Sequence, residues 1–580
     1  MDKVDLTALP FVKDLEAKNP RAYMLAELLS HPEVVRKILR GVADSQLAKH
    51  KGLFHKLLEL RAEECPNKLA LIFENGGQFP DERLTYAQLY ANAMRLAASL
   101  REEGFVKGDK LALVMRNHPE YVYALAACSL LGLVLVPIDP RAKGEKLAYQ
   151  LADCDARAVV TTADLLPVVE AAAKSAPNIN KIYLNLKPDA DLDLAKKYPT
   201  VNEMLDEPLV EHLQAEEENP SLPIQIIYTS GVTGNPKGVT LDSRRNAMYC
   251  LLGYLVWEYQ PDDVLYTGLS LAHGNAQAVT LFPALTMKIP AVISQRFTKS
   301  RIWDICRKYG CTTFSLLGGM MSGIYNEPPR PDDADNPVRK VISAGTPRAI
   351  WEDFERRFNV RILEWYGAIE GGLAFKPIGE GPIGSFGKPL PGLVQMKVVD
   401  EEDNEVPPGV TGELICRMLT QTKVDYYKNP KASEEKMRGG WLRSGDMVHR
   451  DEEGWFFFDY RKGGALRRAG DFIKPDLVEK VIGEHPDVSE VCVYGIPAAS
   501  GAPGESDLVA AVAPFPGRSI DPKSVFEKAI QGLERNSVPS YLQVVEEIPK
   551  SPSEKHLDRL LKEAFSPDAE NVYRLEDYID

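Results

Sequence analysis

One stretch of the chain reads Ile224-Gln-Ile-Ile-Tyr-Thr-Ser-Gly-Val-Thr-Gly-Asn-Pro-Lys-Gly-Val239. An apolar run ends in a loop of glycines and small hydroxyl residues, followed by a lysine. Such a loop can turn backbone N–H groups inward, and its hydroxyls and the Lys237 charge favour phosphate oxygens. It is not a Walker A loop, because Pro236 precedes the lysine and no Gly-Lys-Ser/Thr opens a helix. Small polar loops are also ordinary turns, so the preceding apolar strand is what favours a phosphate site.

Short apolar runs alternate with helical patterns on both sides of this loop. We expect helices at Thr85–Glu103, Glu120–Leu131, Arg301–Tyr309 and Trp351–Phe358. We expect strands at Leu69–Phe73, Lys110–Met115, Val134–Ile138, Ala158–Thr161, Lys181–Leu184, Ala291–Ser294, Thr313–Leu316 and Lys340–Ile342. This alternation predicts an α/β fold whose large N-terminal domain contains layered sheets.

The sequence pattern changes after Pro391. Short strand-like pieces separated by Gly, Pro and acidic turns predict a small β unit, and the glycine pair in Tyr460-Arg-Lys-Gly-Gly-Ala465 predicts a hinge. We therefore divide the chain into a helical N-terminal extension (1–50), a large domain (51–460) and a small, mobile C-terminal α+β domain (461–580). We expect the extension to serve as a packing element or as an oligomer contact, such as that of a homodimer.

Composition limits the partners and the compartment of the protein. The 580 residues carry a net charge of -14, which disfavours nucleic acid and anionic membranes as partners. The eight cysteines form no CxxC pair, so we expect a reducing, cytoplasmic location. The longest apolar run, Tyr123–Ile138, is short for a membrane span and contains Gly132 and Pro137. We expect no membrane span.

Further motifs follow the phosphate loop in a fixed order. They are Ser343-Ala-Gly-Thr-Pro347, Glu364-Trp-Tyr-Gly-Ala-Ile-Glu370, Trp441-Leu-Arg-Ser-Gly-Asp446 and Ile548-Pro-Lys-Ser-Pro-Ser-Glu-Lys555. Together they resemble the adenylate-forming superfamily of acyl-CoA synthetases, aryl-CoA ligases, adenylation domains and luciferases, over about residues 53–565. The chain looks most similar to acyl-CoA ligases and, through Gln295-Arg-Phe297 and its last motif, weakly similar to carnitine/crotonobetaine-CoA ligases.

The resemblance implies a role for each motif residue. Lys555, Lys237 and Glu370 would be catalytic, with Glu370 also holding Mg2+ beside the phosphates. Tyr366 would stack on adenine, and Asp446 would accept from the ribose hydroxyls. The remaining contacts to ATP or to the thiol substrate would come from Thr229, Ser230, Gly231, Thr233, Gly234, Gly345, Thr346, Pro347, Gly367, Arg461 and Gly470.

The acyl pocket is expected near Leu269–Ala276 and Leu316–Met321, with His273, Asn275 and Gly318 among its residues. His273 matches the family's gate residue, although a buried structural histidine is an equal alternative. Neither window contains a carboxylate. A neutral or apolar acyl tail is therefore favoured over an α-amino acid, whose ammonium group would need a buried acid.

The predicted activity is that of an ATP-dependent acid–CoA ligase, which forms an acyl-adenylate and then a CoA thioester. Transfer to a carrier-protein pantetheine and a catalytically weak binding protein stay open as alternatives, as does an oxygenase resembling luciferase. A basic cluster of Arg461, Lys462, Arg467 and Arg468 favours CoA. Departures from the family pattern that affect the expected rate are Val232, Ile369, Gly463 and Glu554.

Overall fold

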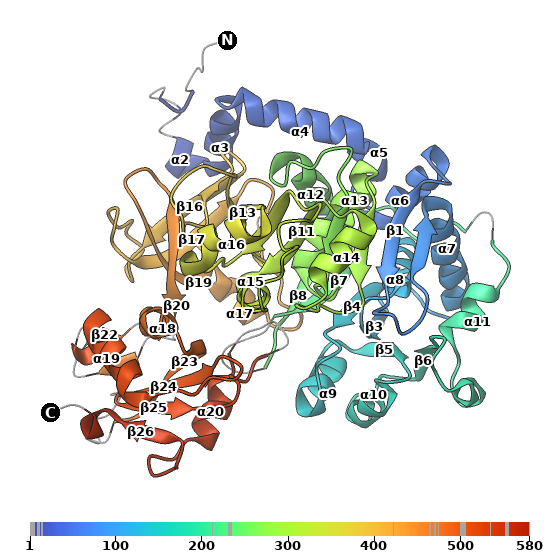
Figure 1. Cartoon of the computed structure of the whole chain (residues 1–580). Helices are drawn as coiled ribbons and strands as arrows, with labels where there is room; N and C mark the ends of the chain where they lie inside the picture. The colour runs from blue at the N-terminus through green and yellow to red at the C-terminus, as the bar shows by residue number, and fades with distance from the viewer. Residues whose placement is uncertain are drawn as a thin grey trace.

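Two parallel-rich sheets form the large part of the molecule (Figure 1). The computed structural model describes residues 6–8, 12, 15–210, 213–229, 235–421, 423–462, 466–468, 471–473, 475–498, 506–533, 535–551 and 556–578. The six-stranded sheet has the order β6-β5-β3-β4-β7-β8, and all its neighbours run parallel except β7 and β8. Its strands are β3 (Lys110–Val114), β4 (Val134–Ile138), β5 (Ala156–Thr162), β6 (Lys181–Asn185), β7 (Pro223–Tyr228) and β8 (Gly238–Asp242).

The nine-stranded sheet has the order β15-β14-β13-β12-β11-β9-β10-β1-β2. Its central strands, from β13 to β1, are parallel to one another, and antiparallel strands close both edges. The strands are β1 (Leu69–Glu74), β2 (Glu82–Thr85), β9 (Leu265–Thr267), β10 (Ala291–Ser294), β11 (Thr313–Leu317), β12 (Lys340–Ala344), β13 (Arg361–Ala368), β14 (Gly371–Lys376) and β15 (Lys388–Pro389).

Helices connect and cover these strands, and their ends follow the sequence. Thr85 caps α7 through a capping box with Gln88, and Gly132 ends α8 in the left-handed conformation. The helices of this part are α6 (Phe54–Glu64), α7 (Tyr86–Glu102), α8 (Pro119–Leu131), α9 (Gly144–Asp153), α10 (Leu166–Ala173), α11 (Val201–Asp206), α12 (Ser243–Leu255), α13 (Phe282–Met287), α14 (Ile302–Tyr309), α15 (Gly318–Tyr325) and α16 (Trp351–Phe358), with a π-helical turn at Ala276–Leu281.

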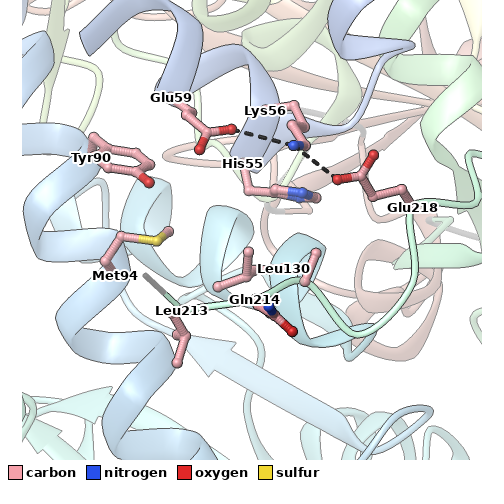
Figure 2. A pocket seen from close by; sticks show the side chains of 10 residues that line it. His55, Lys56, Glu59, Tyr90, Met94, Leu130, Leu213, Gln214 and Glu218 are labelled. Carbon is pink, nitrogen blue, oxygen red and sulfur yellow. Dashed lines mark ion pairs between the residues drawn. The ribbon is translucent and has the colours of Figure 1, made fainter. Parts of the chain in front are cut away.

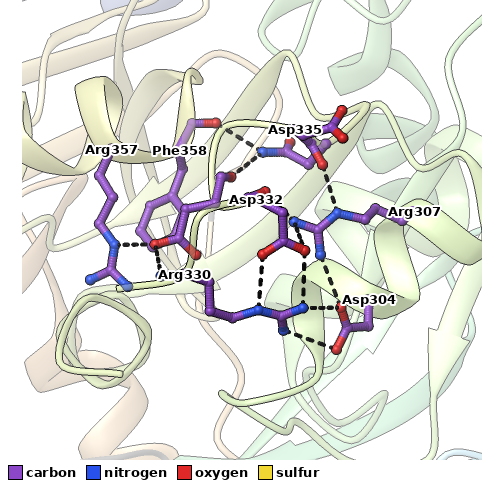
Figure 3. Close-up of polar contacts among 9 residues, drawn as sticks. Asp304, Arg307, Arg330, Asp332, Asp335, Arg357 and Phe358 are labelled. Carbon is purple, nitrogen blue, oxygen red and sulfur yellow. Dashed lines mark hydrogen bonds and ion pairs between the residues drawn. The ribbon is translucent and has the colours of Figure 1, made fainter. Parts of the chain in front are cut away.

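Salt bridges fix the long connection between α15 and β12 (Figure 3). Arg330 bridges to Asp304 of α14 at 3.1 Å, and Arg357 of α16 bridges to Asp333 at 2.7 Å. Asn336 donates to the carbonyl of Phe358 at 2.9 Å. The connection is thus held at several points, which fixes where β12 enters the sheet.

The β unit and the last unit follow the two sheets. The β unit contains β16 (Val394–Val399), β17 (Gly412–Met418), α17 (Pro430–Lys436), β18 (Met437–Arg438), β19 (Trp441–Arg450) and β20 (Phe456–Arg461). The last unit, red in Figure 1, contains β21 (Leu466–Arg468), β22 (Asp471–Ile473), α18 (Pro475–Gly483), β23 (Val488–Pro497), β24 (Ser506–Pro514), α19 (Pro522–Gly532), β25 (Tyr541–Val544), α20 (Asp558–Ala564) and β26 (Val572–Arg574). The predicted α/β class, with a large unit followed by a smaller one, is confirmed.

The first helices lie against α12 and the β unit. They are α2 (Leu15–Lys18), α3 (Pro20–Leu29), α4 (Pro32–Ser45) and α5 (Leu47–His50). In α4, Gly41 faces Leu251 of α12 so closely that an added Cβ would lie 3.0 Å from that side chain. A Cβ added at Gly392, beside the β unit, would lie 2.3 Å from the backbone nitrogen of Leu28. These helices therefore pack onto both α12 and the β unit. Among the described residues, no helix is both long and apolar enough to cross a membrane.

Candidate active site

The predicted motifs lie at the carboxyl ends of neighbouring parallel strands. β9, β11, β12 and β13 are adjacent in the nine-stranded sheet. They lead respectively into the His273 loop, Gly318, the Gly345 loop and the turn to Glu370. In open α/β sheets this edge is where ligands bind. Segments separated by a hundred residues in the sequence thus meet at one edge.

Tyr366 and Asp446 meet across two sheets. The Tyr366 hydroxyl donates to Oδ2 of Asp446 at 2.6 Å. The Tyr366 ring packs at 4.7 Å between centroids on Phe386, which is buried. Asp446 pairs in register with Arg461, whose backbone lies in β20. This contact joins the aromatic and the Gly-Asp motifs, which the sequence places 80 residues apart.

A tyrosine outside the predicted motifs connects the lysine to the glutamate. Tyr426 donates its hydroxyl to Oε1 of Glu370 at 2.8 Å. The Lys237 ammonium group lies 5.3 Å from the centroid of the Tyr426 ring. Residue 426 also forms a β-bridge with Val239, which fixes it beside the end of the phosphate loop. Lys237 and Glu370 therefore lie on either side of one aromatic side chain.

The two ends of the predicted phosphate loop are paired with each other. The backbone N–H of Thr229 donates to the carbonyl of Lys237 at 2.9 Å. This bond closes the loop between β7 and β8, which are antiparallel. The loop residues Ser230, Gly231, Val232, Thr233 and Gly234 lie outside the described residues.

The Gly345 loop is held by a buried carboxyl group that the sequence reading passed over. Oε1 of Glu364 accepts from the N–H of Gly345 at 2.6 Å, and Oε2 accepts from the Thr346 hydroxyl. The N–H of Thr346 donates to the same carboxyl group at 3.2 Å. Burial raises the pKa of Glu364 to about 8, against the effect of these donors. The polar groups of Thr346 are thus directed at Glu364 of β13.

Gly318 touches the same loop from the other side. A Cβ on Gly318 would lie 1.8 Å from the carbonyl oxygen of Gly345, so no larger residue fits there. Gly345 itself has φ +80°, a conformation that favours glycine. The close approach of Gly318 and Gly345 seats the loop against the start of α15. Pro347 follows directly and precedes a 3-10 turn at Arg348–Ile350, while Gly367 is exposed in β13.

His273 is paired with a carboxylate that comes from outside the predicted acyl windows. Its Nε2 lies 2.7 Å from Oδ2 of Asp139, which follows β4 of the other sheet. Arg141 contacts Asp139 at 3.1 Å. Although burial alone would raise it, the His273 hydrogen bond and the Arg141 charge keep the pKa of Asp139 below its ordinary value. The windows themselves contain no acid, but the surroundings of His273 do, and this acid already has two partners.

Two further polar residues lie near His273, the half-buried Asn275 and the buried Asn117. Neither Oδ1 nor Nδ2 of Asn275 has a hydrogen-bond partner among the residues that the structure describes. Asn117, after β3, donates to the carbonyls of Leu269 and Ser294 and accepts from the N–H of Leu271. Asn117 therefore clamps the start of the His273 loop to the six-stranded sheet.

The departure at Ile369 has a packing partner. A Cβ on Gly274 would lie 2.9 Å from Cδ1 of Ile369. The side chain that replaces the family's usual hydroxyl residue therefore packs beside the His273 loop and adds apolar surface there.

The basic cluster expected to favour CoA is partly engaged elsewhere. Lys462 pairs with Glu413 at 2.9 Å. Arg468 donates to the carbonyls of Asn536 and Val538, and burial lowers its pKa. These two side chains anchor local structure. The side chains of Arg461 and Arg467, and all of Gly463, Gly470, Glu554 and Lys555, lie outside the described residues.

A shallow depression of about 500 Å³ lies elsewhere, between α6, α7 and residues 213–218 (Figure 2). Lys56 bridges it by pairing with Glu218 at 2.8 Å and with Glu59 at 3.5 Å. Leu130, in its lining, precedes β4, so the depression is on the side where the strands begin. It does not share the edge at which the predicted motifs meet.

Known proteins of similar sequence and fold include CoA ligases. The chain is 29% identical over 499 residues to the medium/long-chain-fatty-acid–CoA ligase FadD17 of Mycobacterium tuberculosis, covering 85% of this chain and 94% of the relative. It is 27% identical over 527 residues to the crotonobetaine/carnitine–CoA ligase of Proteus mirabilis, covering 86% and 97%. The anthranilate CoA ligase AuaEII, solved in complex with anthranoyl-AMP, shares the fold with a TM-score of 0.77 and 22% identity, covering 88% of this chain and 96% of that chain.

Family models match both units of the chain. The model described as AMP-binding enzyme matches residues 58–423, and the model described as AMP-binding enzyme C-terminal domain matches residues 477–555. The first match alone covers more than half of the chain. The prediction made from the ordered motifs is confirmed, and the protein belongs to the AMP-binding enzyme family.

Proposed function

We propose that this protein is an ATP-dependent, AMP-forming acid–CoA ligase of the cytoplasm that acts on fatty acids. The observation that carries the proposal is a pair of contacts at the two ends of the segment from Tyr366 to Glu370: Tyr366 bonds Asp446, and Tyr426 contacts both Glu370 and Lys237. The four predicted residues among these come from three separate segments, because Tyr366 and Glu370 share one motif, and they include an aromatic face, two carboxylates and a cation. That set suits a purine, a sugar diol and a triphosphate.

In this proposal the nucleotide lies along the edge between β12 and β13. Tyr366, fixed by Phe386 and by its bond to Asp446, offers a ring face to adenine. Asp446 accepts from the ribose, with Arg461 as its cross-strand neighbour. Glu364 holds the Gly345 loop against the other side of the base. Thr229, Ser230, Gly231, Thr233, Gly234 and Lys237 would take the phosphates.

Glu370 is the proposed ligand of Mg2+. The fit is chemical: Mg2+ prefers hard oxygen donors, and the Tyr426 hydroxyl fixes the orientation of this carboxylate. When bound, Mg2+ would neutralise phosphate charge. Lys237 adds a second positive charge nearby. The protein's own contribution is thus to place both charges before the acid arrives.

The carboxylate of the substrate attacks the α-phosphorus of ATP, its oxygen forms the new P–O bond, and pyrophosphate leaves. The positive charge of Lys555 would offset the repulsion between the substrate carboxylate and the α-phosphate. In the second step the thiol sulfur attacks the acyl carbon and AMP leaves. We place the hinge for the exchange of these steps in the run Tyr460–Ala465, where β20 ends.

The proposed acyl substrate is a fatty acid. Leu269, Leu271 and Ala276 of the His273 loop are buried, and so are Met320 and Met321 of α15. The Asp139 carboxylate is already paired with His273 and Arg141, so it does not offer an ammonium group an uncompensated charge. The relative FadD17 is named for medium and long-chain fatty acids.

Pyrophosphate exchange with a panel of acids tests the proposal. We expect exchange with fatty acids, formation of acyl-CoA by mass spectrometry, and no exchange with α-amino acids. Lys555→Ala should lower exchange on the order of a hundredfold or more. The matched control is Lys562→Ala, because Lys562 pairs with Asp558 on the surface of α20.

The same experiment separates the alternatives. If the protein catalyses exchange and acylates a carrier-protein pantetheine but not CoA, the acceptor is the carrier protein and not CoA. Absence of exchange with aliphatic, aryl and carnitine-like acids would indicate a binding protein instead. A strong preference for amino acids would refute the assignment of an apolar pocket.

A further inference from the structure

The last unit contains a cluster of metal-binding side chains that the proposed reaction does not use. β23 is an edge strand of the sheet β23-β24-β25-β26. The carboxyl group of Glu479, from α18, reaches this edge and accepts from the backbone N–H of Val493 at 2.7 Å. The Glu479 carboxyl group therefore lies at the unpaired edge of β23, next to Cys492.

Three different ligand types meet at this edge. One carboxylate oxygen of Glu479, Sγ of Cys492 and one ring nitrogen of His556 all lie within 4.8 Å of one another. They come from α18, β23 and the segment before α20, so the tertiary fold brings them together. Ligand atoms around a tetrahedral Zn2+ with bonds of about 2.0–2.3 Å are about 3.3–3.8 Å apart, so the side chains must move inward by about 1 Å to close the cluster.

A second carboxyl group orients the histidine. Oε1 of Glu490 lies 3.2 Å from Nε2 of His556 and 2.6 Å from the Lys550 ammonium group. A carboxylate that accepts from the second ring nitrogen of a metal-bound histidine fixes the orientation of the ring. If Nε2 of His556 binds the ion instead, the Glu490 carboxylate is close enough to become the fourth ligand. Cys492 is 2% exposed and His556 is 28% exposed. The cluster is thus closed on the sulfur side and open to solvent on the histidine side.

We propose that Glu479, Cys492 and His556 bind a thiophilic divalent cation of the Zn2+ class. Sulfur, imidazole and carboxylate together suit Zn2+ and disfavour Mg2+, which prefers oxygen ligands throughout. When the metal–sulfur bond forms, the thiol proton leaves to solvent. The thiolate and the Glu479 carboxylate then balance the two positive charges of the ion. Three protein ligands leave a fourth position for water or for Glu490.

The site would restrain the segment that follows residue 555. His556 is the next residue after Lys555, and Lys550 and His556 are joined by an isolated β-bridge. A metal bound to His556 would tie this β-bridge to the edge of β23. This consequence rests on the proposed function, because it concerns the catalytic lysine. The binding of the metal does not.

Titration of the full chain with Cd2+ tests the site directly. Cd2+ bound to a thiolate absorbs in the ultraviolet, and this band requires no enzymatic activity. Cys65, which is only partly buried, is first replaced by Ser to remove a competing thiol. We expect one equivalent of Cd2+ to produce the band in this background, and Zn2+ to suppress it.

Variants of the cluster decide the outcome. Cys492→Ser should abolish the band, and His556→Ala should weaken Cd2+ binding at least tenfold while the partly exposed position keeps the fold intact, as circular dichroism will show. The matched control is Cys306→Ser, because Cys306 is buried in α14 of the large part. A full band in Cys492→Ser, no band before substitution, or unchanged affinity in His556→Ala would each overturn the site.

Discussion

Glu364→Gln tests the role of the buried carboxyl group behind the Gly345 loop. Glu364 accepts from two backbone N–H groups and one hydroxyl through both of its oxygens. Glutamine keeps one accepting oxygen and replaces the other with an NH2 group that faces donors. About two hydrogen bonds are lost, each contributing about 1–1.5 kcal/mol. We therefore expect the loop to be displaced at a cost of about 2–3 kcal/mol.

This cost should appear in nucleotide binding. If the loop lines the adenine slot, about 2–3 kcal/mol corresponds to a rise in KM for ATP of about 30- to 150-fold. Pyrophosphate exchange at varied ATP measures it, with the acid saturating. The matched control is Glu355→Gln, because Glu355 of α16 accepts from the N–H of Ile362 at the opposite end of β13. The control should leave KM for ATP within about twofold of the original value, as expected for a surface change.

A folded Glu364→Gln enzyme with unchanged KM for ATP would refute this reasoning. It would mean either that the loop does not contact the nucleotide or that Gly318 alone holds it. A parallel fall in the Glu355→Gln control would show instead that any loosening of β13 disturbs the site.

Three further predictions concern metal use, acid stability and packing. Tyr426→Phe keeps the ring under Lys237 but removes the donor to Glu370. The Mg2+ concentration for half-maximal exchange should rise about tenfold, whereas Tyr427→Phe, whose hydroxyl bonds Asp155, should not change it. Burial lowers the pKa of His118 to about 4, so the unfolded chain takes up a proton first and stability is lost as pH falls from 6.5 towards 4. Urea unfolding at several pH values should show that this residue lowers the free energy of unfolding by at most about 3 kcal/mol, and His118→Asn should remove that part of the pH dependence. An identical pH dependence in the variant would contradict the assignment. Gly318→Ala should lower the melting temperature and abolish exchange, because its Cβ meets the Gly345 carbonyl at 1.8 Å, while Gly323→Ala in the same helix meets nothing closer than 3.7 Å and should be tolerated. Equal effects of the two substitutions would argue against the contact.

The fold could be predicted because buried parallel strands have a distinct sequence pattern. Val134–Ile138 is a continuous apolar run bounded by glycine and aspartate, and it forms β4 at those limits. Trp351–Phe358 likewise forms α16 as expected. Pro32 separates α3 from α4 and occupies the first turn of α4, where its missing N–H has no cost. Local chemistry was sufficient for these elements.

Several site contacts could not be predicted, because they depend on pairing between distant segments. Asp139 follows a buried strand, and the end of a parallel strand is a reason to examine a charged residue. Its partner His273 is 134 residues away, however, and nothing local connects them. Asn117 and Tyr426 lie outside recognisable motifs for the same reason. Glu364 is the first residue of a recognisable motif, but its burial behind the Gly345 loop has no signature in the sequence.

The contact between Leu28 and Gly392 has a practical consequence. The family match begins at residue 58, which invites shortening of the chain to that point. Such a truncated protein would lose α3 and α4. It would expose the apolar face of α12 around Leu251 and the surface at Gly392 that Leu28 covers. Exposed apolar surface of this kind promotes aggregation. Recombinant work on this enzyme should therefore retain its first helices, and purification tags are better placed elsewhere.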